Sequence, residues 1–162
     1  MSEQLENFSP SCERNKQVIL AELQPLLAQC FEVLEIGSFS GQHALHFSEK
    51  LPQLFWHTSD VASNLNALNH NLSYFAPDNC RLPFELDVSQ KSQWPEQYFD
   101  AIYTANTLHI MSWENVQQLF ANIRQVTKQG TLFVVYGPFN YDGKFTSNSN
   151  ADFEQWFGSR YQ

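Results

Sequence analysis

A glycine turn between a predicted strand and a predicted helix is the part of this sequence best placed to do chemistry. Residues 33–41 read Val-Leu-Glu-Ile-Gly-Ser-Phe-Ser-Gly, and a helical pattern of apolar residues starts at Gln42. Glycine lets a backbone approach a ligand closely, and the first N–H groups of a helix are unpaired. The carboxylate of Glu35 precedes the turn, where it is placed to bind a cationic or hydroxyl-bearing group. This combination favours S-adenosylmethionine over a phosphate-bearing ligand.

Other nucleotide-binding motifs fit the same turn poorly. The dinucleotide fingerprint Gly-x-Gly-x-x-Gly requires glycine at positions 37, 39 and 42, but Phe39 and Gln42 occupy the last two. A phosphate-binding P-loop is also disfavoured, because no Gly-Lys-Ser/Thr follows the turn. Two alternatives stay open: an NAD-binding enzyme, and a strand–turn–helix corner that binds nothing.

Composition limits the classes of protein that the chain fits. Its 162 residues suit one domain over 1–162, and 43% of them are hydrophobic, as expected of a folded core. The net charge is −8 and the nine Lys and Arg residues do not cluster, so a nucleic-acid partner is disfavoured. Cys12, Cys30 and Cys80 form no Cys-x-x-Cys pair, which disfavours a disulfide framework or a structural zinc site. The sequence shows no long apolar run, so we expect a cytoplasmic protein without a membrane partner.

Predicted helices and strands alternate along the chain. Such alternation indicates an α/β fold, with a mostly parallel sheet and helices on both of its faces. Within the single domain we expect an N-terminal helix or lid over 1–30, a cofactor-binding core over 31–136, and a loop with a short helix over 137–162. The hydrophobic patterns predict helices over 12–29, 61–73 and 113–128 besides the one after the glycine turn, and strands over 31–36, 54–59, 81–86, 99–105 and 131–136.

Polar residues follow or end four consecutive predicted strands. Glu35, Asp60, Asp87 and Asn106 stand at these places, and ligands of parallel sheets lie beyond the carboxyl ends of the strands. We expect Asp60 to accept hydrogen bonds from the two ribose hydroxyls. Asp87, with its neighbour Val88, is expected to lie beside the adenine. Each acid alone also fits a helix cap or a turn, but their recurrence at successive strand ends favours a ligand site.

The glycine turn resembles the first motif of class I methyltransferases. That motif is written Glu/Asp-x-Gly-x-Gly-x-Gly, and Glu35, Gly37 and Gly41 match it. Phe39 stands at the middle glycine, a position where catechol-type O-methyltransferases have an aromatic residue. Ser38 and His43, in the turn and the helix that it opens, are counted with Asn106 among the expected cofactor contacts.

Segments along most of the chain resemble the methyltransferase-like protein 26 family. They comprise residues 9–16 (Ser-Pro-Ser-Cys-Glu-Arg-Asn-Lys), 33–47, 99–102, 136–139 (Tyr-Gly-Pro-Phe) and 149–153. The resemblance implies a Rossmann-like class I methyltransferase fold and S-adenosylmethionine as the cofactor. It also implies that strands six and seven of that fold are missing here. We therefore expect the edge of the fifth strand to be covered by a local helix or to form a homodimer.

Methyl transfer proceeds by in-line displacement, so the expected acceptor side needs orienting groups and a base. Asn106, His109, Tyr136 and Asn140 are the candidates there, and His109 is the one that titrates near neutral pH. Structural roles for His109 and Tyr136 stay open. Residues 13–15 (Glu13, Arg14 and Asn15) are predicted to contact the substrate or to form a lid.

No metal is expected to take part. Catechol-type transfer needs carboxylates after the fourth and fifth strands to hold Mg²⁺, but Asn106 and Tyr136 stand there. The unknown methyl acceptor is expected to be a small molecule, with a protein acceptor as the alternative. The other open hypothesis is a non-catalytic protein that binds the cofactor or another protein.

Overall fold

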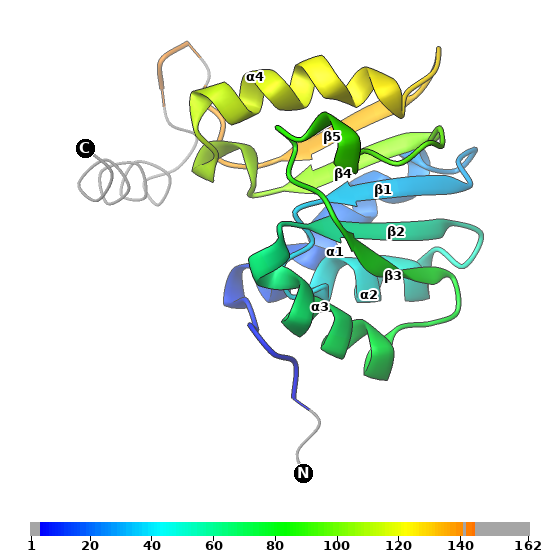
Figure 1. Cartoon of the computed structure of the whole chain (residues 1–162). Helices are drawn as coiled ribbons and strands as arrows, with labels where there is room; N and C mark the ends of the chain where they lie inside the picture. Colours follow the sequence, from blue (N-terminus) through cyan, green and yellow to red (C-terminus); the bar gives the residue numbers. More distant parts are fainter. Residues whose placement is uncertain (1–3, 141, 145–162) are drawn as a thin grey trace.

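Five parallel strands form one sheet in the order β3-β2-β1-β4-β5. This computed structural model describes residues 4–140 and 142–144 (Figure 1). The chain adds β2 and β3 on one side of β1, then crosses to add β4 and β5 on the other. The order therefore reverses between β1 and β4, where α/β sheets form their ligand crevice. The strands are β1 (Glu32–Ile36), β2 (Phe55–Asp60), β3 (Cys80–Glu85), β4 (Ala101–Ala105) and β5 (Leu132–Tyr136).

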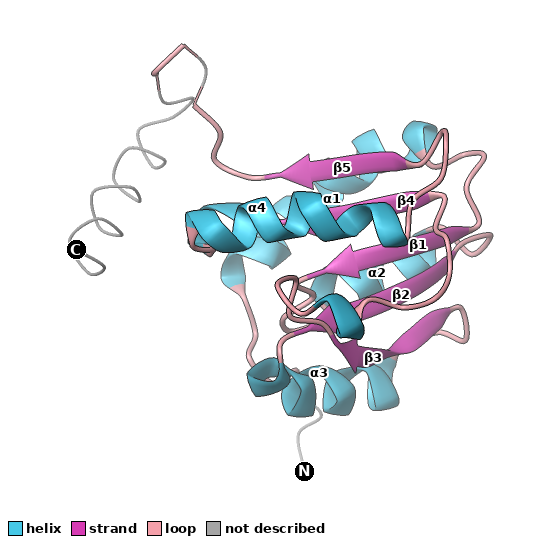
Figure 2. Cartoon of the chain, turned by 45° about the horizontal axis from the view of Figure 1, so that its top comes forward, coloured by secondary structure: helices cyan, strands magenta, loops and turns pink. Residues whose placement is uncertain are grey.

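Helices cover both faces of the sheet. Helices α1 (Pro10–Leu26), α2 (Gln42–Lys50) and α3 (Ala62–Phe75) contribute to one hydrophobic core. Helix α4 (Trp113–Asn122) packs into a second core on the opposite face, together with the loop that precedes β4. Figure 2 shows α4 in front of the sheet with α1 and α2 behind it. The predicted Rossmann-like α/β architecture is confirmed.

Side-chain alternation along β1 divides its residues between the two cores. Val33 packs toward α1 and α2, while Leu34 and Ile36 pack into the core on the α4 face. Successive side chains of a strand point to opposite faces, so Glu35 shares the face of Val33. The predicted carboxylate thus belongs to the strand itself and points toward the helices α1 and α2.

The predicted helices differ from the structure in their bounds. Ser9 caps α1, with its Oγ accepting from the backbone N–H of Cys12 (3.3 Å), so the helix predicted over 12–29 begins at Pro10 and ends at Leu26. The helix predicted over 113–128 is α-helical only to Asn122 and then tightens into a 3₁₀ turn over Ile123–Gln125. A 3₁₀ turn satisfies the terminal carbonyls of the helix with i→i+3 hydrogen bonds, which are more tightly spaced than the i→i+4 bonds of an α-helix. Most of the segment predicted to hold a short last helix lies outside the described residues.

β5 is the outer strand on its side of the sheet. Among the described residues it is paired with β4 and with no other strand. The homodimer predicted for this edge therefore stays a prediction. In the described part of the chain, no helix is both long and apolar enough to cross a membrane.

Candidate functional site

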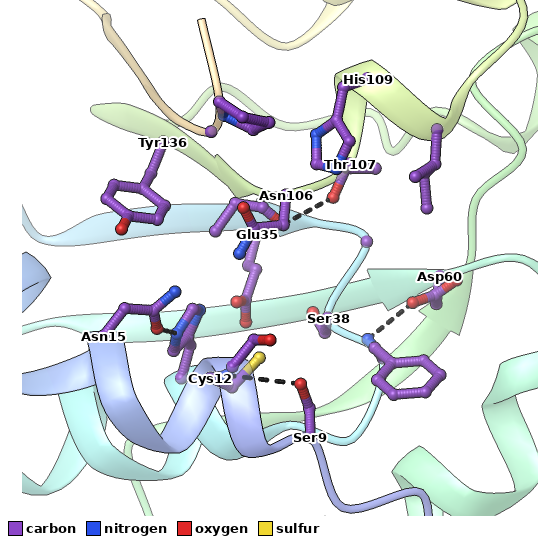
Figure 3. A pocket seen from close by; sticks show the side chains of 18 of the residues that line it. Ser9, Cys12, Asn15, Glu35, Ser38, Asp60, Asn106, Thr107, His109 and Tyr136 are labelled. Carbon is purple, nitrogen blue, oxygen red and sulfur yellow. Dashed lines mark hydrogen bonds between the residues drawn. The ribbon is translucent and has the colours of Figure 1, made fainter. Parts of the chain in front are cut away.

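A cavity of about 1030 Å³ opens beyond the carboxyl ends of the strands, between the sheet and the first turns of α1 (Figure 3). Its walls come from α1, the glycine turn, the end of β2, the first turn of α3, and the loops after β4 and β5. This is the position that the reversal of strand order predicts. The lining residues are Ser9, Ser11, Cys12, Arg14, Asn15, Val18, Glu35, Gly37, Ser38, Phe39, His43, Asp60, Asn64, Ala105, Asn106, Thr107, His109, Ile110, Tyr136, Gly137 and Pro138.

The glycine turn takes backbone conformations that favour glycine. Gly37 has φ +76°, and Gly41, which opens α2, has φ +75°. A Cβ on Gly41 would lie 3.0 Å from Leu68 Cδ1, so this glycine also permits close packing of α3. Phe39 has φ +50°, a left-handed conformation that is rare for an aromatic residue. The glycine of the methyltransferase motif at this position is therefore explained by backbone geometry.

Glu35 is a buried carboxyl group that lines the cavity. Its side chain is 2% exposed, and Oε2 accepts a hydrogen bond from the indole Nε1–H of Trp56 (3.0 Å). Burial raises the pKa of Glu35 to about 7, and the nearby negative charge of Asp60 adds to this effect. Hydrogen bonds from Trp56 and Ser38 to the carboxylate oppose the shift. A positive ligand group in the cavity would stabilise the ionised form.

Asp60 ends β2 and holds the glycine turn in place. Its Oδ2 accepts from the backbone N–H of Phe39 (2.7 Å), and its Oδ1 accepts from Val61 N–H and Asn64 Nδ2 (both 2.8 Å). The group is 7% exposed. Each carboxylate oxygen has lone pairs for further donors, so these bonds leave room for a ligand hydroxyl. The N-cap residue of α3 is Val61, so Asp60 stabilises the glycine turn and is not the helix cap, and its contact with a ribose stays a prediction.

His43 connects the sheet to α1. The hydroxyl of Tyr103 lies 3.2 Å from Nδ1, and Asn15 Oδ1 lies 2.7 Å from Nε2. Burial lowers the pKa of His43 to about 4, so the ring is neutral at pH 7. A neutral ring donates from one nitrogen and accepts at the other, which fits donation from Nε2 to Asn15 and acceptance from Tyr103.

Three of the four predicted acceptor-side residues line the cavity. Asn106 has φ +54°, and its backbone N–H donates to the carbonyl of Tyr136 (2.8 Å), which joins the loops after β4 and β5. His109 lies in a 3₁₀ turn over Leu108–Ile110, and burial lowers the pKa of its ring. The side chain of Tyr136 is 40% exposed. Asn140 is exposed and is not a lining residue.

The predicted N-terminal trio is divided between two sides of α1. Arg14 and Asn15 line the cavity, but Glu13 lines a smaller cavity of about 360 Å³ beside α2. There Glu13 pairs with Lys16 and accepts from Gln42 Nε2 (3.2 Å). Residues of a helix lie about 100° apart around its axis, so three consecutive side chains cannot face one site. Glu13 thus lies outside the larger cavity, and its predicted contact with the substrate stays a prediction.

Asp87 and Val88, the predicted adenine contacts, are not lining residues of the cavity. Asp87 lies two residues beyond the end of β3, and its Oδ1 accepts from the backbone N–H (2.9 Å) and the hydroxyl (2.7 Å) of Ser89. Val88 is buried, and its carbonyl accepts from Trp94 Nε1 (3.2 Å) and Asn122 Nδ2 (2.9 Å). Their contacts with adenine stay a prediction.

Several lining residues were not predicted from the sequence. Asn64 stands four residues after Asp60, one helical turn away, and this spacing could have identified it. Thr107 and Cys12 carry no comparable signal, because their neighbours in space come from distant segments. Within the described part of the chain, no group of three His, Cys, Asp or Glu side chains is arranged to hold a metal ion.

Comparison with known proteins supports this reading of the fold. A family model described as protein of unknown function (DUF938) matches residues 6–161. Phosphoethanolamine N-methyltransferase of Plasmodium falciparum is 28% identical over 144 residues, covering 88% of this chain and 50% of that protein. The chain thus spans about half the length of this curated relative.

Solved methyltransferase structures share the fold. An O-methyltransferase family protein from Burkholderia thailandensis superposes with a TM-score of 0.75 at 15% identity, covering 90% of this chain and 45% of that one. The glycopeptide N-methyltransferase MtfA in complex with S-adenosylmethionine superposes with a TM-score of 0.62 at 18% identity, covering 72% of this chain and 52% of that one. The likeness to both establishes the Rossmann-like methyltransferase fold.

Proposed function

The chain belongs to the DUF938 family of proteins of unknown function, and we propose that it is an S-adenosylmethionine-dependent methyltransferase acting on a small-molecule acceptor. The observation that carries this proposal is the pair of buried carboxylates, Glu35 and Asp60, on adjacent strands of one cavity. The glycine turn runs between them. In this proposal Glu35 binds a cationic group of the cofactor and Asp60 binds its ribose hydroxyls.

The fold and the relatives also support a methyltransferase. The chain shares its fold with methyltransferases, among them a structure in complex with S-adenosylmethionine. The curated relative is named for phosphoethanolamine, a small amine, which supports a small-molecule acceptor. The narrower assignment to the methyltransferase-like protein 26 family is part of this proposal. It rests on the segments 9–16 and 136–139.

The residues on the acceptor side suit a proton transfer. When bound, the cofactor supplies an electrophilic methyl group on a sulfonium. The acceptor oxygen or nitrogen forms the new bond to that methyl as the carbon–sulfur bond breaks, and its proton must leave. Burial lowers the pKa of His109, which favours the neutral ring that a general base needs to accept this proton. Asn106 and Tyr136 line the same cavity and would orient the acceptor.

Titration calorimetry with S-adenosylmethionine and S-adenosylhomocysteine tests the cofactor site. We expect micromolar binding to the full chain, and at least tenfold weaker binding to Asp60→Asn, because the variant loses a charged acceptor. Asp100→Asn is the matched control, since Asp100 also accepts from two backbone N–H groups (Phe31, 2.9 Å; Glu32, 3.1 Å) but precedes β4 at the opposite end of the sheet. No binding of either ligand at millimolar concentration to the folded protein would refute the proposal. NAD binding instead would favour the dinucleotide alternative.

A cofactor-binding protein without catalysis is the second candidate. Phe39 favours it, because this side chain lines the cavity at a position where the methyltransferase motif has glycine. Release of S-adenosylhomocysteine from S-adenosylmethionine, measured across a panel of amines, phenols and carboxylic acids, separates the two candidates. Binding without turnover on any acceptor would favour the second.

We also propose that β5 pairs with a second copy of this chain. The backbone of Leu132 bonds toward β4, through its N–H to Asp100 O (3.0 Å), so the backbone groups of Phe133 and Val135 point outward. Sedimentation should show a dimer that Val135→Pro converts to a monomer, because proline removes an outward N–H without breaking the bonds to β4. A monomeric wild-type protein at 100 µM would contradict this pairing.

A further inference from the structure

The charged residues of the cavity are distributed unevenly between its walls. Both carboxylates, Glu35 and Asp60, come from strands of the sheet. Among the described lining residues, Arg14 is the one lysine or arginine, and it stands on the facing wall, in the first turns of α1. Its guanidinium has one neutral partner, Ser11 Oγ at 3.3 Å, and forms no ion pair with a described residue. A charge without an opposite partner at a cavity wall is available to a ligand.

The neighbouring residue Asn15 presents a second donor on the same wall. Its Oδ1 is used by His43 Nε2, at 2.7 Å, and the ring of His43 is held by the Tyr103 hydroxyl on its other nitrogen. In this arrangement the oxygen of the Asn15 amide faces His43. The amide nitrogen is left on the cavity side, as Figure 3 shows, with no partner among the described residues. Asn15 is half-buried, so an unused donor there has less access to water than one on the surface.

We propose that Arg14 and Asn15 bind the carboxylate at the amino-acid end of S-adenosylmethionine, an inference that rests on the cofactor proposed above. That end of the cofactor is an α-amino acid, whose ammonium and carboxylate are attached to one carbon. A site for it needs an acceptor and donors a few ångströms apart. Glu35 is the acceptor, and it extends from β1 toward the α1 wall on which Asn15 lies (Figure 3). Arg14 and Asn15 are the donors.

The position of a positive charge on one wall and negative charges on the other supports this proposal. The chain is acidic, with nine Lys and Arg against 17 Asp and Glu, so a cation at the cavity wall does not follow from composition. Lys16, two residues further along, is turned away and pairs with Glu13. α1 thus directs one of its two neighbouring cations to the cavity and neutralises the other.

Two ligands that differ in the amino-acid end test the subsite. S-adenosylhomocysteine carries the ammonium and the carboxylate, whereas 5′-methylthioadenosine has the same adenosine thioether without them. We would measure both by titration calorimetry with the full-length protein, with Arg14→Gln and Asn15→Asp as variants. Asp at position 15 still accepts from His43 but places an oxygen where the amide nitrogen stood. Lys16→Gln is the control, because it removes a positive charge of the same helix outside the cavity.

Arg14→Gln and Asn15→Asp should each lower the affinity for S-adenosylhomocysteine at least tenfold. The affinity of either variant for 5′-methylthioadenosine should change by less than twofold. The loss in Arg14→Gln should shrink when NaCl is raised from 0.05 to 0.5 M, because Arg14 is exposed and its charge is screened. Lys16→Gln should bind both ligands as the wild type does.

Three results would overturn the subsite. Unchanged affinity of Arg14→Gln and Asn15→Asp for S-adenosylhomocysteine would mean that these donors serve an anionic methyl acceptor or no ligand. An equal loss of affinity for both ligands would indicate that the substitutions disturb the whole cavity. If neither ligand binds the wild type at millimolar concentration, the proposed function fails, and the subsite fails with it.

Discussion

Thr107 Oγ1 lies 2.7 Å from the position that a Cβ on Gly37 would take, and Thr107 Cγ2 lies 2.8 Å from it. Residue 37 therefore needs glycine for two separate reasons, its φ of +76° and the contact with the loop after β4. This contact links the turn that faces the proposed cofactor to the loop that carries His109. The two halves of the proposed site thus meet at the contact between Gly37 and Thr107.

Gly37→Ala should lower the free energy of unfolding by about 3 kcal/mol. The left-handed conformation costs an alanine about 1 kcal/mol, and forcing a methyl group into a filled site costs about 2 kcal/mol more. Urea unfolding followed by circular dichroism measures the sum. The variant should also lose affinity for S-adenosylhomocysteine, because the turn must shift to admit the methyl group.

Gly130→Ala separates the two causes. Gly130 has φ +92°, but a Cβ there would meet no atom within 4 Å, so only the backbone cost of about 1 kcal/mol should appear. Adding Thr107→Ala to Gly37→Ala should recover part of the loss. Equal destabilisation by Gly37→Ala and Gly130→Ala would show that the contact with Thr107 is easily relieved.

The left-handed backbone at Phe39 should favour asparagine over a β-branched residue at this position. Asparagine adopts the left-handed region more readily than phenylalanine, and a β-branched residue adopts it less readily. The Phe39 residue is 40% exposed, so both variants lose the buried part of the aromatic ring. We therefore expect the free energy of unfolding of Phe39→Asn to exceed that of Phe39→Val by about 1 kcal/mol. A urea midpoint that is lower in Phe39→Asn than in Phe39→Val would contradict this backbone argument.

The sequence predicted those features of the site that depend on local pattern. The five strands, the glycine turn, and the carboxylates Glu35 and Asp60 follow from hydrophobic runs and residue spacing. The pairing of His43 with Asn15 could not be predicted, because it depends on how α1 packs against α2. The same packing turns Glu13 away from the cavity. Asp87 does not line the cavity, and the strand before it ends at Glu85, one residue earlier than the pattern indicated.

The raised pKa of Glu35 predicts a loss of stability as pH rises. The carboxyl of Glu35 titrates near 4.5 in an unfolded chain and at about 7 in the native protein. Between these values the native state holds a proton that the unfolded state has lost, so the free energy of unfolding falls with rising pH. The contribution amounts to about 3 kcal/mol by pH 7 and is then constant. Glu35→Gln keeps an acceptor for Trp56 without titrating, so the stability difference between wild type and variant should fall by this amount from pH 4.5 to 7.

His43 provides a control of opposite sign for that measurement. Its pKa is lowered to about 4, so between pH 4 and 6.5 the unfolded state binds more protons than the native state. The stability contributed by His43 therefore rises with pH in this window and is lost as pH falls. The difference between wild type and His43→Gln should rise where the difference for Glu35→Gln falls. Two differences that change in the same direction would contradict the assigned shifts.

His109 is expected to act on methyl transfer and not on cofactor binding. Removing a general base that takes the acceptor proton typically lowers a rate by a factor of about 10² to 10⁴. His109→Gln should show this loss in the release of S-adenosylhomocysteine with an acceptor found by screening, while its calorimetric affinity for S-adenosylhomocysteine should match the wild type. Because burial lowers the pKa of His109, the wild-type rate should rise with pH through a value below 6.5. The rate of His109→Gln should not show this rise with pH. A wild-type rate in His109→Gln would mean that the acceptor needs no base from the protein, and that Tyr136 and Asn106 only position it.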